Sequence, residues 1–348
     1  MELIIKPTEL CNFKCTFCSS TKLVEDKAST LDHQYIFDFL DRFPNTNSII
    51  VNGGDPLMMK PDYYFTILDY IEKHNLPTSI SLTTNLWAFY KKPDMWVSLF
   101  KHPRVFVTTS FQYGFGRVIS GDRIYTEKDF WNVSDLFLKH VGYRPGFIAV
   151  ISEENERHAI RHVELAKKMD VQCKLNYAMA SGEQSKPYRL SKIYEAYINI
   201  YELGLHPWEF NTKQMMTRLN NIANVCPQAR NCDSHIRSLN PAGDYYSCGA
   251  MGDDKEYPID FVKEIKQKQF IKPLEDAPEL FSLKDECVTC PMFNICNGCK
   301  KTIKDLKQHD MVEEHCSHMK QLAPRIIKIN SETDYVEASQ RIHKSIVS

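Results

Sequence analysis

The sequence lacks both an excess of charge and a long hydrophobic run. Its 348 residues include 43 basic and 44 acidic side chains, which gives a formal net charge of −1. This balance provides no overall attraction to nucleic acid or to anionic membranes, so nucleic acid is not favoured as a partner, although a single base or a short strand stays open. No apolar run approaches the roughly 18 residues that span a bilayer. We therefore expect no membrane partner.

The N-terminus also lacks the features of a signal peptide. Residues 1–7 read Met-Glu-Leu-Ile-Ile-Lys-Pro and become polar too soon for a secretory apolar region. We therefore expect a cytoplasmic protein, in a compartment where disulfides are rare. The sequence nevertheless has twelve cysteines. Clustered cysteines in a reducing compartment usually bind metal or carry out redox chemistry.

Short β-branched runs alternate with amphipathic stretches over the first two thirds of the chain. The amphipathic stretches place apolar residues on one helical face, as Ile36, Phe39 and Leu40 do. Repeats at intervals of roughly 30 residues predict right-handed βα units, hence an α/β fold whose parallel sheet curls into a partial, TIM-like (βα)6 barrel. The six predicted strands cover residues 3–5, 48–51, 79–82, 105–107, 147–150 and 173–177.

This alternation ends before the cysteines arrive in bursts from Cys226 onward. At about 100–200 residues per domain, the length suits two domains, or one large α/β domain with an appendage. We predict a barrel domain over residues 1–225, a cysteine-rich domain over residues 226–330 and a C-terminal helix or tail over residues 331–348.

Three cysteines, Cys11, Cys15 and Cys18, follow the first predicted strand within eight residues. Three thiolates are one short of closing a four-iron cube, so one iron keeps an open position. An open position is typical of catalytic metal sites. A structural zinc site is the alternative, but it needs a fourth ligand nearby. The next candidate, His33, lies inside a helical pattern.

The C-x3-C-x-aromatic-C motif, with Phe17 as its aromatic residue, resembles that of the radical S-adenosylmethionine (SAM) enzymes. The resemblance covers the chain to about residue 225. It implies a [4Fe–4S] cluster whose open iron chelates SAM. It also implies reductive cleavage of SAM to a 5′-deoxyadenosyl radical, which abstracts hydrogen from an unactivated carbon.

The resemblance also implies which residues contact SAM. A Gly-Gly segment after the second strand is similar to the family's Gly-Gly-Glu-Pro segment, with Asp in place of Glu. A Ser-x-Gln segment closes the fourth strand where relatives carry Ser-x-Asp. An arginine after that strand could pair with the SAM carboxylate or lie in a solvated loop, and an asparagine after the fifth strand could approach the nucleoside or cap a helix. The expected contacts are Phe17, Asn52, Gly53, Gly54, Asp55, Ser110, Gln112, Arg123 and Asn155.

The later part of the chain holds eight further cysteines, enough to close two more cubes. Their spacing resembles the SPASM domain, a C-terminal extension of radical SAM enzymes that include the anaerobic sulfatase-maturating enzymes. That resemblance implies two auxiliary [4Fe–4S] clusters, and so three clusters in all. The implied ligand sets are Cys226, Cys232, Cys248 and Cys299 for one auxiliary cluster, and Cys287, Cys290, Cys296 and Cys316 for the other.

Two points in this cysteine-rich region stay open. Only two residues separate Cys296 from Cys299, where the family usually has three, so the cluster that Cys299 joins is not fixed. A zinc ribbon would explain four of the eight cysteines and leave the others idle. The twelfth cysteine, Cys173, heads a strand and is either a small buried hydrophobic residue or a hydrogen-donating thiol.

We therefore expect an oxidoreductase or maturase of the radical SAM type. The resemblance favours oxidation, cross-linking or epimerisation of a peptide or protein side chain, with a flavodoxin- or ferredoxin-type electron donor. One alternative is modification of a small molecule, nucleotide or nucleic-acid base. A non-catalytic iron–sulfur or zinc protein in electron transfer or sensing is the other. No catalytic acid, base or hydrogen donor can be named from the sequence.

Overall fold

The structure is a computed structural model that describes residues 1–20, 25–26, 28–218, 235–267, 284–290, 292–296 and 299–332. The chain divides into two compact units, each discontinuous in sequence. The first consists of residues 1–148, 180–185 and 232–276, and the second of residues 149–179, 186–231 and 277–348. The predicted domain boundary near residue 225 and the predicted tail beyond residue 332 lie outside the described residues.

The first unit is built on a sheet in the order β10-β9-β1-β2-β3-β4-β7, where β7 continues into the second unit. All neighbouring strands are parallel except β9 and β10, which are antiparallel. Buried side chains alternate along β1, β2 and β3, because successive residues of a strand point to opposite faces. The strands are β1 (Glu2–Ile5), β2 (Ser48–Val51), β3 (Ser79–Thr83), β4 (Val105–Ser110), β7 (Phe147–Ile151), β9 (Ile236–Leu239) and β10 (Tyr245–Tyr246).

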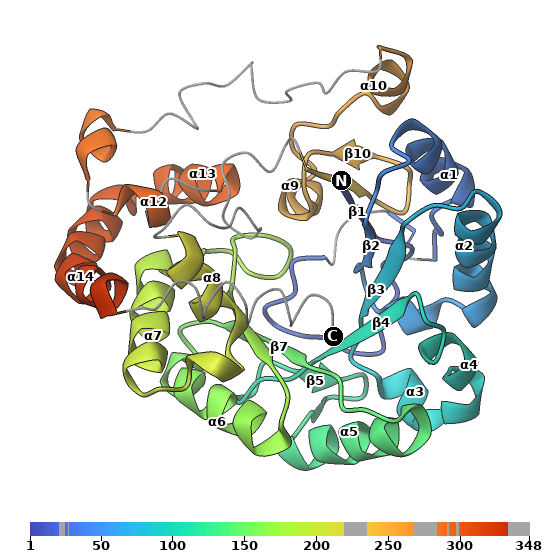
Figure 1. Cartoon of the computed structure of the whole chain (residues 1–348), viewed down its shortest axis with the longest axis horizontal. Coiled ribbons are helices and arrows are strands. Elements are labelled where there is room, and N and C mark those ends of the chain that lie inside the picture. The colour runs from blue at the N-terminus through green and yellow to red at the C-terminus, as the bar shows by residue number, and fades with distance from the viewer. Residues whose placement is uncertain are drawn as a thin grey trace. The chain divides into compact units, whose positions relative to one another are not determined.

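Helices follow the strands of the first unit and lie outside the sheet (Figure 1). Helix α1 begins after Asp32, whose side chain accepts a hydrogen bond from the Gln34 N–H, as is typical of helix N-caps. Helix α5 begins with a capping box between Thr126 and Asp129 and ends at Gly142, where φ is 105°. The helices are α1 (His33–Arg42), η1 (Pro56–Met58), α2 (Pro61–Lys73), α3 (Trp87–Lys91), η2 (Pro93–Met95), α4 (Val97–Phe100), α5 (Glu127–Val141), α9 (Gly249–Asp254) and α10 (Phe261–Gln267).

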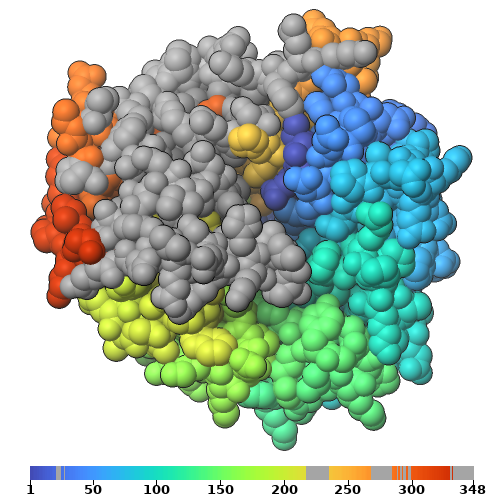
Figure 2. All heavy atoms as spheres, viewed as in Figure 1, coloured from blue at the N-terminus to red at the C-terminus, as the bar shows by residue number. Residues whose placement is uncertain are grey.

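A short hairpin in the first unit joins β5 (Val118–Ile119) to β6 (Arg123–Ile124) in antiparallel pairing. Helix α9 lies beside β1 (Figures 1 and 2), and Gly249 at its start approaches the Ile4 side chain. The Lys6 Nζ donates a hydrogen bond of 3.0 Å to the Gly249 carbonyl there.

In the second unit, β8 (Cys173–Tyr177) is the neighbour of β7. Helices α7 and α14 pack together through two exposed ion pairs, Arg325–Glu202 and Arg189–Glu314. The helices of this unit are η3 (Glu156–His158), α6 (Ala159–Met169), α7 (Leu190–Glu202), η4 (His206–Trp208), α8 (Phe210–Arg218), η6 (Asp285–Thr289), α12 (Phe293–Cys296), α13 (Lys300–Gln308) and α14 (Val312–Glu332).

The predicted α/β class is confirmed, and all six predicted strands are present in the predicted order. Strands β9 and β10 are additional, and they arise where we predicted no further α/β alternation. Within the ranges that the structure describes, no helix is both long and apolar enough to cross a bilayer.

Candidate functional site

The three-cysteine loop directly follows β1 and is fixed by the β5–β6 hairpin. The Lys14 N–H donates to the Val118 carbonyl at 2.7 Å, and the Thr16 N–H donates to the Gly116 carbonyl at 3.0 Å. A tight turn inside the loop brings the Cys18 N–H within 3.2 Å of the Cys15 carbonyl. These backbone contacts determine the course of the loop, so its cysteines do not depend on a ligand for their placement.

The cysteine sulfurs of this loop are partly buried, and a buried carboxylate, that of Asp55, acts on Cys11. Two donors reach the Cys11 Sγ, the Phe13 N–H at 3.3 Å and the Asn85 Nδ2 at 3.9 Å. Burial, and then the carboxylate of Asp55, raise the pKa of Cys11 well above its usual range. Burial also raises the pKa of Cys18, to about 11. Metal coordination would deprotonate these thiols, and three cysteine thiolates are a donor set that could hold an iron–sulfur cluster with one open iron.

The predicted Gly53-Gly54 segment packs tightly against the residues that lead into the loop. The Gly54 N–H donates to the Thr8 carbonyl at 2.9 Å, and the Asp55 N–H donates to the Leu10 carbonyl at 2.8 Å. A Cβ on Gly54 would lie 2.1 Å from the Leu10 oxygen, closer than any side chain can approach. The glycines therefore allow two backbone segments to approach each other closely. The Asn52 N–H adds a further backbone hydrogen bond, to the Ile5 carbonyl at 2.9 Å.

Asp55 is fully buried and holds the loops after β2 and β3 together. Its carboxylate accepts hydrogen bonds from the Leu57 N–H, the Thr84 hydroxyl and the Asn85 N–H, at 2.8 to 3.0 Å. Burial raises the pKa of Asp55 to about 6 in spite of these donors. Asp55 thereby positions Asn85, whose side-chain amide donates to the Asn12 Oδ1 at 2.7 Å beside Cys11.

The arginine beside the cysteine loop is Arg117, which our sequence reasoning missed. Its side chain is 6% exposed and lies over the Phe17 ring, 5.4 Å from the ring centroid. Its Nη1 donates to the Ser110 Oγ at 2.9 Å, which brings two predicted contacts, Phe17 and Ser110, to one place. The Arg117 Nε is buried and has no hydrogen-bond partner among the described residues.

Arg123, the arginine that we predicted, points elsewhere. It is 51% exposed, pairs with Asp129 at 2.9 Å and lies over the Trp87 ring. Asp129 belongs to the capping box of α5, so the helix N-terminus and Arg123 share one carboxylate. The sequence did contain one sign in favour of Arg117, because it directly follows the Gly114-Phe115-Gly116 segment, a few residues beyond β4.

The two remaining predicted contacts, Gln112 and Asn155, are both buried. Gln112 is buried just beyond β4, next to Phe111, whose N–H donates to the Ile148 carbonyl at 3.0 Å. In the second unit, the Asn155 side chain accepts from the Ser152 N–H and donates to the Val150 carbonyl, both at 2.9 Å. Asn155 therefore closes the turn after β7 rather than capping a helix with its side chain.

A further contact that was not foreseen ties the cysteine loop to α9. The Asp253 carboxylate accepts hydrogen bonds from the Ser19 and Ser20 hydroxyls at 2.8 and 2.9 Å and forms a buried ion pair with Lys6. Ser19 directly follows Cys18, and α9 begins directly after Cys248. No local sequence pattern could reveal contacts between residues more than 230 positions apart.

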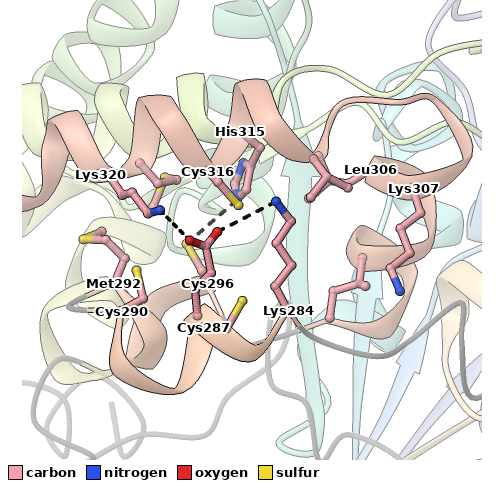
Figure 3. Close-up of a pocket in the computed structure, with 14 residues that line it drawn as sticks. Lys284, Cys287, Cys290, Met292, Cys296, Leu306, Lys307, His315, Cys316 and Lys320 are labelled. Atoms are coloured by element: carbon pink, nitrogen blue, oxygen red, sulfur yellow. Dashed lines mark hydrogen bonds and ion pairs between the residues drawn. The ribbon is translucent and has the colours of Figure 1, made fainter.

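Four cysteines of the second unit line one cavity (Figure 3). They come from η6, the segment after it, the end of α12 and α14, and Met292, Ile303, Leu306 and Met319 supply apolar walls. The cavity measures about 90 Å³. That is too small for an organic cofactor, which needs roughly 300 Å³ or more. The four are Cys287, Cys290, Cys296 and Cys316, the set predicted for one auxiliary cluster.

The four thiols of this cavity lie close enough to affect one another's ionisation and could together hold an iron–sulfur cluster. Burial, followed by the neighbouring thiols of Cys290, Cys316 and Cys287, raises the pKa of Cys296 well above its usual range. No three His, Cys, Asp or Glu side chains in the described ranges converge on one metal ion, at this cavity or elsewhere.

The other predicted cysteines are only partly accounted for. Cys248 precedes α9 in the first unit, and Cys299 precedes α13 in the second and is not among the residues that line the cavity. Cys226 and Cys232 lie outside the described residues. Cys173 is 1% exposed at the start of β8, the end of the strand away from the loops that carry a barrel's active site. This placement favours the buried hydrophobic role over that of a hydrogen donor.

Comparison with known proteins now identifies the N-terminal part of the chain. Residues 5–166 match the Radical SAM superfamily. The chain contains a radical SAM domain. The family's common cofactors are SAM and a [4Fe–4S] cluster, and the three-cysteine loop lies within the matched residues. A search of curated proteins finds no match.

Solved structures resemble the chain over nearly its whole length. The structure of anSMEcpe with bound AdoMet has a TM-score of 0.74 at 17% identity and covers 98% of both chains. A structure of anSMEcpe with AdoMet and the Cp18Cys peptide has a TM-score of 0.71 at 19% identity, over 95% of this chain and 98% of the other. SuiB from Streptococcus suis, bound to precursor peptide SuiA, has a TM-score of 0.56 at 17% identity, over 86% of this chain and 72% of that one. At these identities the likeness shows a common fold.

Proposed function

We propose that this radical SAM enzyme uses two auxiliary iron–sulfur clusters and modifies a side chain of a peptide or protein. The observation that carries the proposal is the pairing of an open three-cysteine loop with a separate cavity lined by four cysteines. The first suits a cluster that must bind SAM, and the second suits a closed cluster that shuttles electrons or supports the fold.

Cys11, Cys15 and Cys18 would hold the SAM-binding cluster. When bound, this cluster supplies the electron that cleaves SAM. The chain's own residues then have two tasks near it. The Phe13 N–H and the Asn85 amide donate toward the Cys11 sulfur, and the β5–β6 hairpin keeps the loop in place. Hydrogen bonds of this kind orient metal ligands and adjust their basicity.

Arg117 and Ser110 would bind the SAM carboxylate. A buried guanidinium with an unpartnered Nε has a strong preference for a planar anion, because its fork of donors matches a carboxylate. Arg117 already contacts the Phe17 ring and the Ser110 hydroxyl, so a carboxylate bound there would lie beside the cysteine loop. Gly53, Gly54 and Asp55 would act on SAM indirectly, through the backbone and the Asn85 side chain that they hold.

Cys287, Cys290, Cys296 and Cys316 would hold one auxiliary cluster. Cys226, Cys232, Cys248 and Cys299 would hold the other, by the order of cysteines in the SPASM family. Support for a peptide substrate comes from the shared fold, because two of the similar structures contain bound peptides. A flavodoxin- or ferredoxin-type protein would donate the electron.

The test of the peptide assignment is substrate-dependent formation of 5′-deoxyadenosine by the reconstituted full chain. Each abstraction breaks one C–H bond of the substrate and places that hydrogen on 5′-deoxyadenosine, so the product counts the events. A pool of random-sequence peptides should raise its rate of formation several-fold, with a change in peptide mass or stereochemistry. Stimulation by a nucleoside pool, and none by peptides, would contradict the assignment.

Cys290→Ala is the matched variant for this experiment. It leaves the three-cysteine loop intact and removes one ligand of the four-cysteine cavity. We expect it to retain slow SAM cleavage without substrate and to lose the peptide-stimulated turnover.

A further inference from the structure

His315 contacts a cysteine of the four-cysteine cavity. It lies on α14, is 7% exposed, and places its Nε2 3.8 Å from the Cys296 Sγ (Figure 3). That distance is within the range of a hydrogen bond to sulfur. The adjacent residue on the helix, Cys316, also lines the cavity, so one turn of α14 delivers both a sulfur ligand and an imidazole.

The surroundings of His315 determine which ring nitrogen carries the proton. Its Nδ1 is buried and has no hydrogen-bond partner among the described residues. A neutral imidazole has one donor and one acceptor nitrogen. If Nδ1 carried the proton, a buried donor would be left unpaired and the Nε2 lone pair would face the Cys296 sulfur. A proton on Nε2 instead gives the thiolate a donor, so the cluster-bound form favours this tautomer.

Two of the lysines that line the cavity are engaged with carboxylates. Lys320 pairs with Glu286 at 3.0 Å (Figure 3). Lys284 pairs with both Glu286 and Glu313. Both lysines are partly exposed, so solvent screens them and their carboxylate partners offset their charge. His315 is the buried donor among these residues.

We propose that His315 is a positioning residue that donates a hydrogen bond from Nε2 to the Cys296 thiolate and thereby raises the reduction potential of the auxiliary cluster in this cavity. The inference rests on the proposed function, because it requires a cluster held by the four cysteines. A hydrogen bond to a ligand sulfur withdraws negative charge and stabilises the reduced cluster, which carries one more electron.

The experiment is a potentiometric titration of the reconstituted full chain followed by electron paramagnetic resonance. The signal of this cluster is identified as the one that Cys290→Ala removes. We expect His315→Leu to shift the midpoint of this signal to a more negative potential, by at least tenfold in the oxidation–reduction equilibrium, which is about 59 mV for one electron. In His315→Gln, which keeps a donor of similar reach, the midpoint should lie close to that of the wild type.

His318→Leu is the matched control, because His318 lies on the same helix but faces Glu195 at 3.6 Å and does not line the cavity. It should leave the midpoint unchanged. An unchanged midpoint in His315→Leu, with the cluster signal intact, would overturn the inference. If His315→Leu loses the cluster while His315→Gln keeps it, the hydrogen bond is needed to retain the cluster, which supports the inference. Loss in both variants counts against a hydrogen-bond role.

Iron content separates a failure of this inference from a failure of the proposed function. Three cubes give about twelve irons per chain, and Cys290→Ala should lower that number to about eight. If the wild-type protein holds only about eight irons and Cys290→Ala removes none, the cavity holds no cluster and both proposals fall.

Discussion

At Asp55, a single buried carboxylate holds two loops that surround the cysteine loop. Three donors favour its charged form, yet removal from water outweighs them and raises the pKa to about 6. The folded protein therefore binds this proton more tightly than the unfolded chain does. Its contribution to the free energy of unfolding is fully present below about pH 4 and is lost as the pH rises to about 6.

Asp55→Asn should remove this pH dependence. The shift of the pKa corresponds to about 3 kcal/mol. Asp55 should therefore lower the free energy of unfolding of the wild type by about 3 kcal/mol as the pH rises from about 4 to 6, and Asp55→Asn should not show this fall. Denaturant unfolding under anaerobic conditions at a series of pH values measures it. Asp62→Asn, at an exposed carboxylate in the first turn of α2, is the control and should change the slope little. An unaltered slope in Asp55→Asn would refute the role of Asp55.

Arg117 and Arg123 offer a paired test of SAM binding. Hydrogen bonds to charged groups contribute roughly 1.5–3 kcal/mol, so Arg117→Gln should weaken SAM binding by about 10- to 100-fold. Arg123→Gln should change the affinity little, because Arg123 pairs with Asp129 at the surface. Equilibrium binding of SAM to the reconstituted proteins measures both, and equal affinities in the two variants would rule out Arg117 as the carboxylate ligand.

The two arginines also show how far residue-level prediction can go. Sequence pattern predicted the three cysteines, the glycine pair and Ser110, because their spacing is local to one loop or strand end. It pointed to Arg123 and not to Arg117, six residues before it. That choice depends on the α5 capping box, which engages Arg123 through Asp129, and on the Phe17 ring, which packs against Arg117.

Among the elements, β9 shows why part of the fold could not be predicted. Six strands were recognisable from apolar runs, but β9 reads Ile-Arg-Ser-Leu and all four residues are buried. Arg237 is tolerated there because it forms a fully buried ion pair with Glu264 on α10, at 2.7 Å. The charged Arg237 interrupts the apolar run by which a four-residue buried strand could be recognised. Its partner, Glu264, lies 27 positions further along the chain.

The Arg237–Glu264 pair should be sensitive to the loss of either partner. Glu264→Gln leaves a buried guanidinium without its counter-charge, and breaking such a pair typically costs about 3–5 kcal/mol. Glu202→Gln, which breaks the exposed pair with Arg325, should cost about 1 kcal/mol or less. Denaturant unfolding of both variants checks this. Similar losses in the two would contradict the burial argument.

At the scale of the whole molecule, the twelve cysteines divide by their surroundings. Three lie in a loop fixed by backbone contacts, four line a cavity in the second unit, and Cys173 is buried. The other four comprise Cys248, Cys299 and two outside the described residues. The net charge of the chain gives no information about this division, because it is a sum over all residues and the cysteines are grouped by the loop or cavity in which they lie.

The central claim is that the three-cysteine loop holds the SAM-cleaving cluster of a three-cluster enzyme. The most direct test is anaerobic reconstitution followed by iron analysis and assay of 5′-deoxyadenosine, with wild type and Cys15→Ala side by side. We predict about twelve irons per chain and reductive SAM cleavage in the wild type, and about eight irons with no 5′-deoxyadenosine in the variant. Stoichiometric zinc in place of iron, or undiminished SAM cleavage by Cys15→Ala, would contradict the claim.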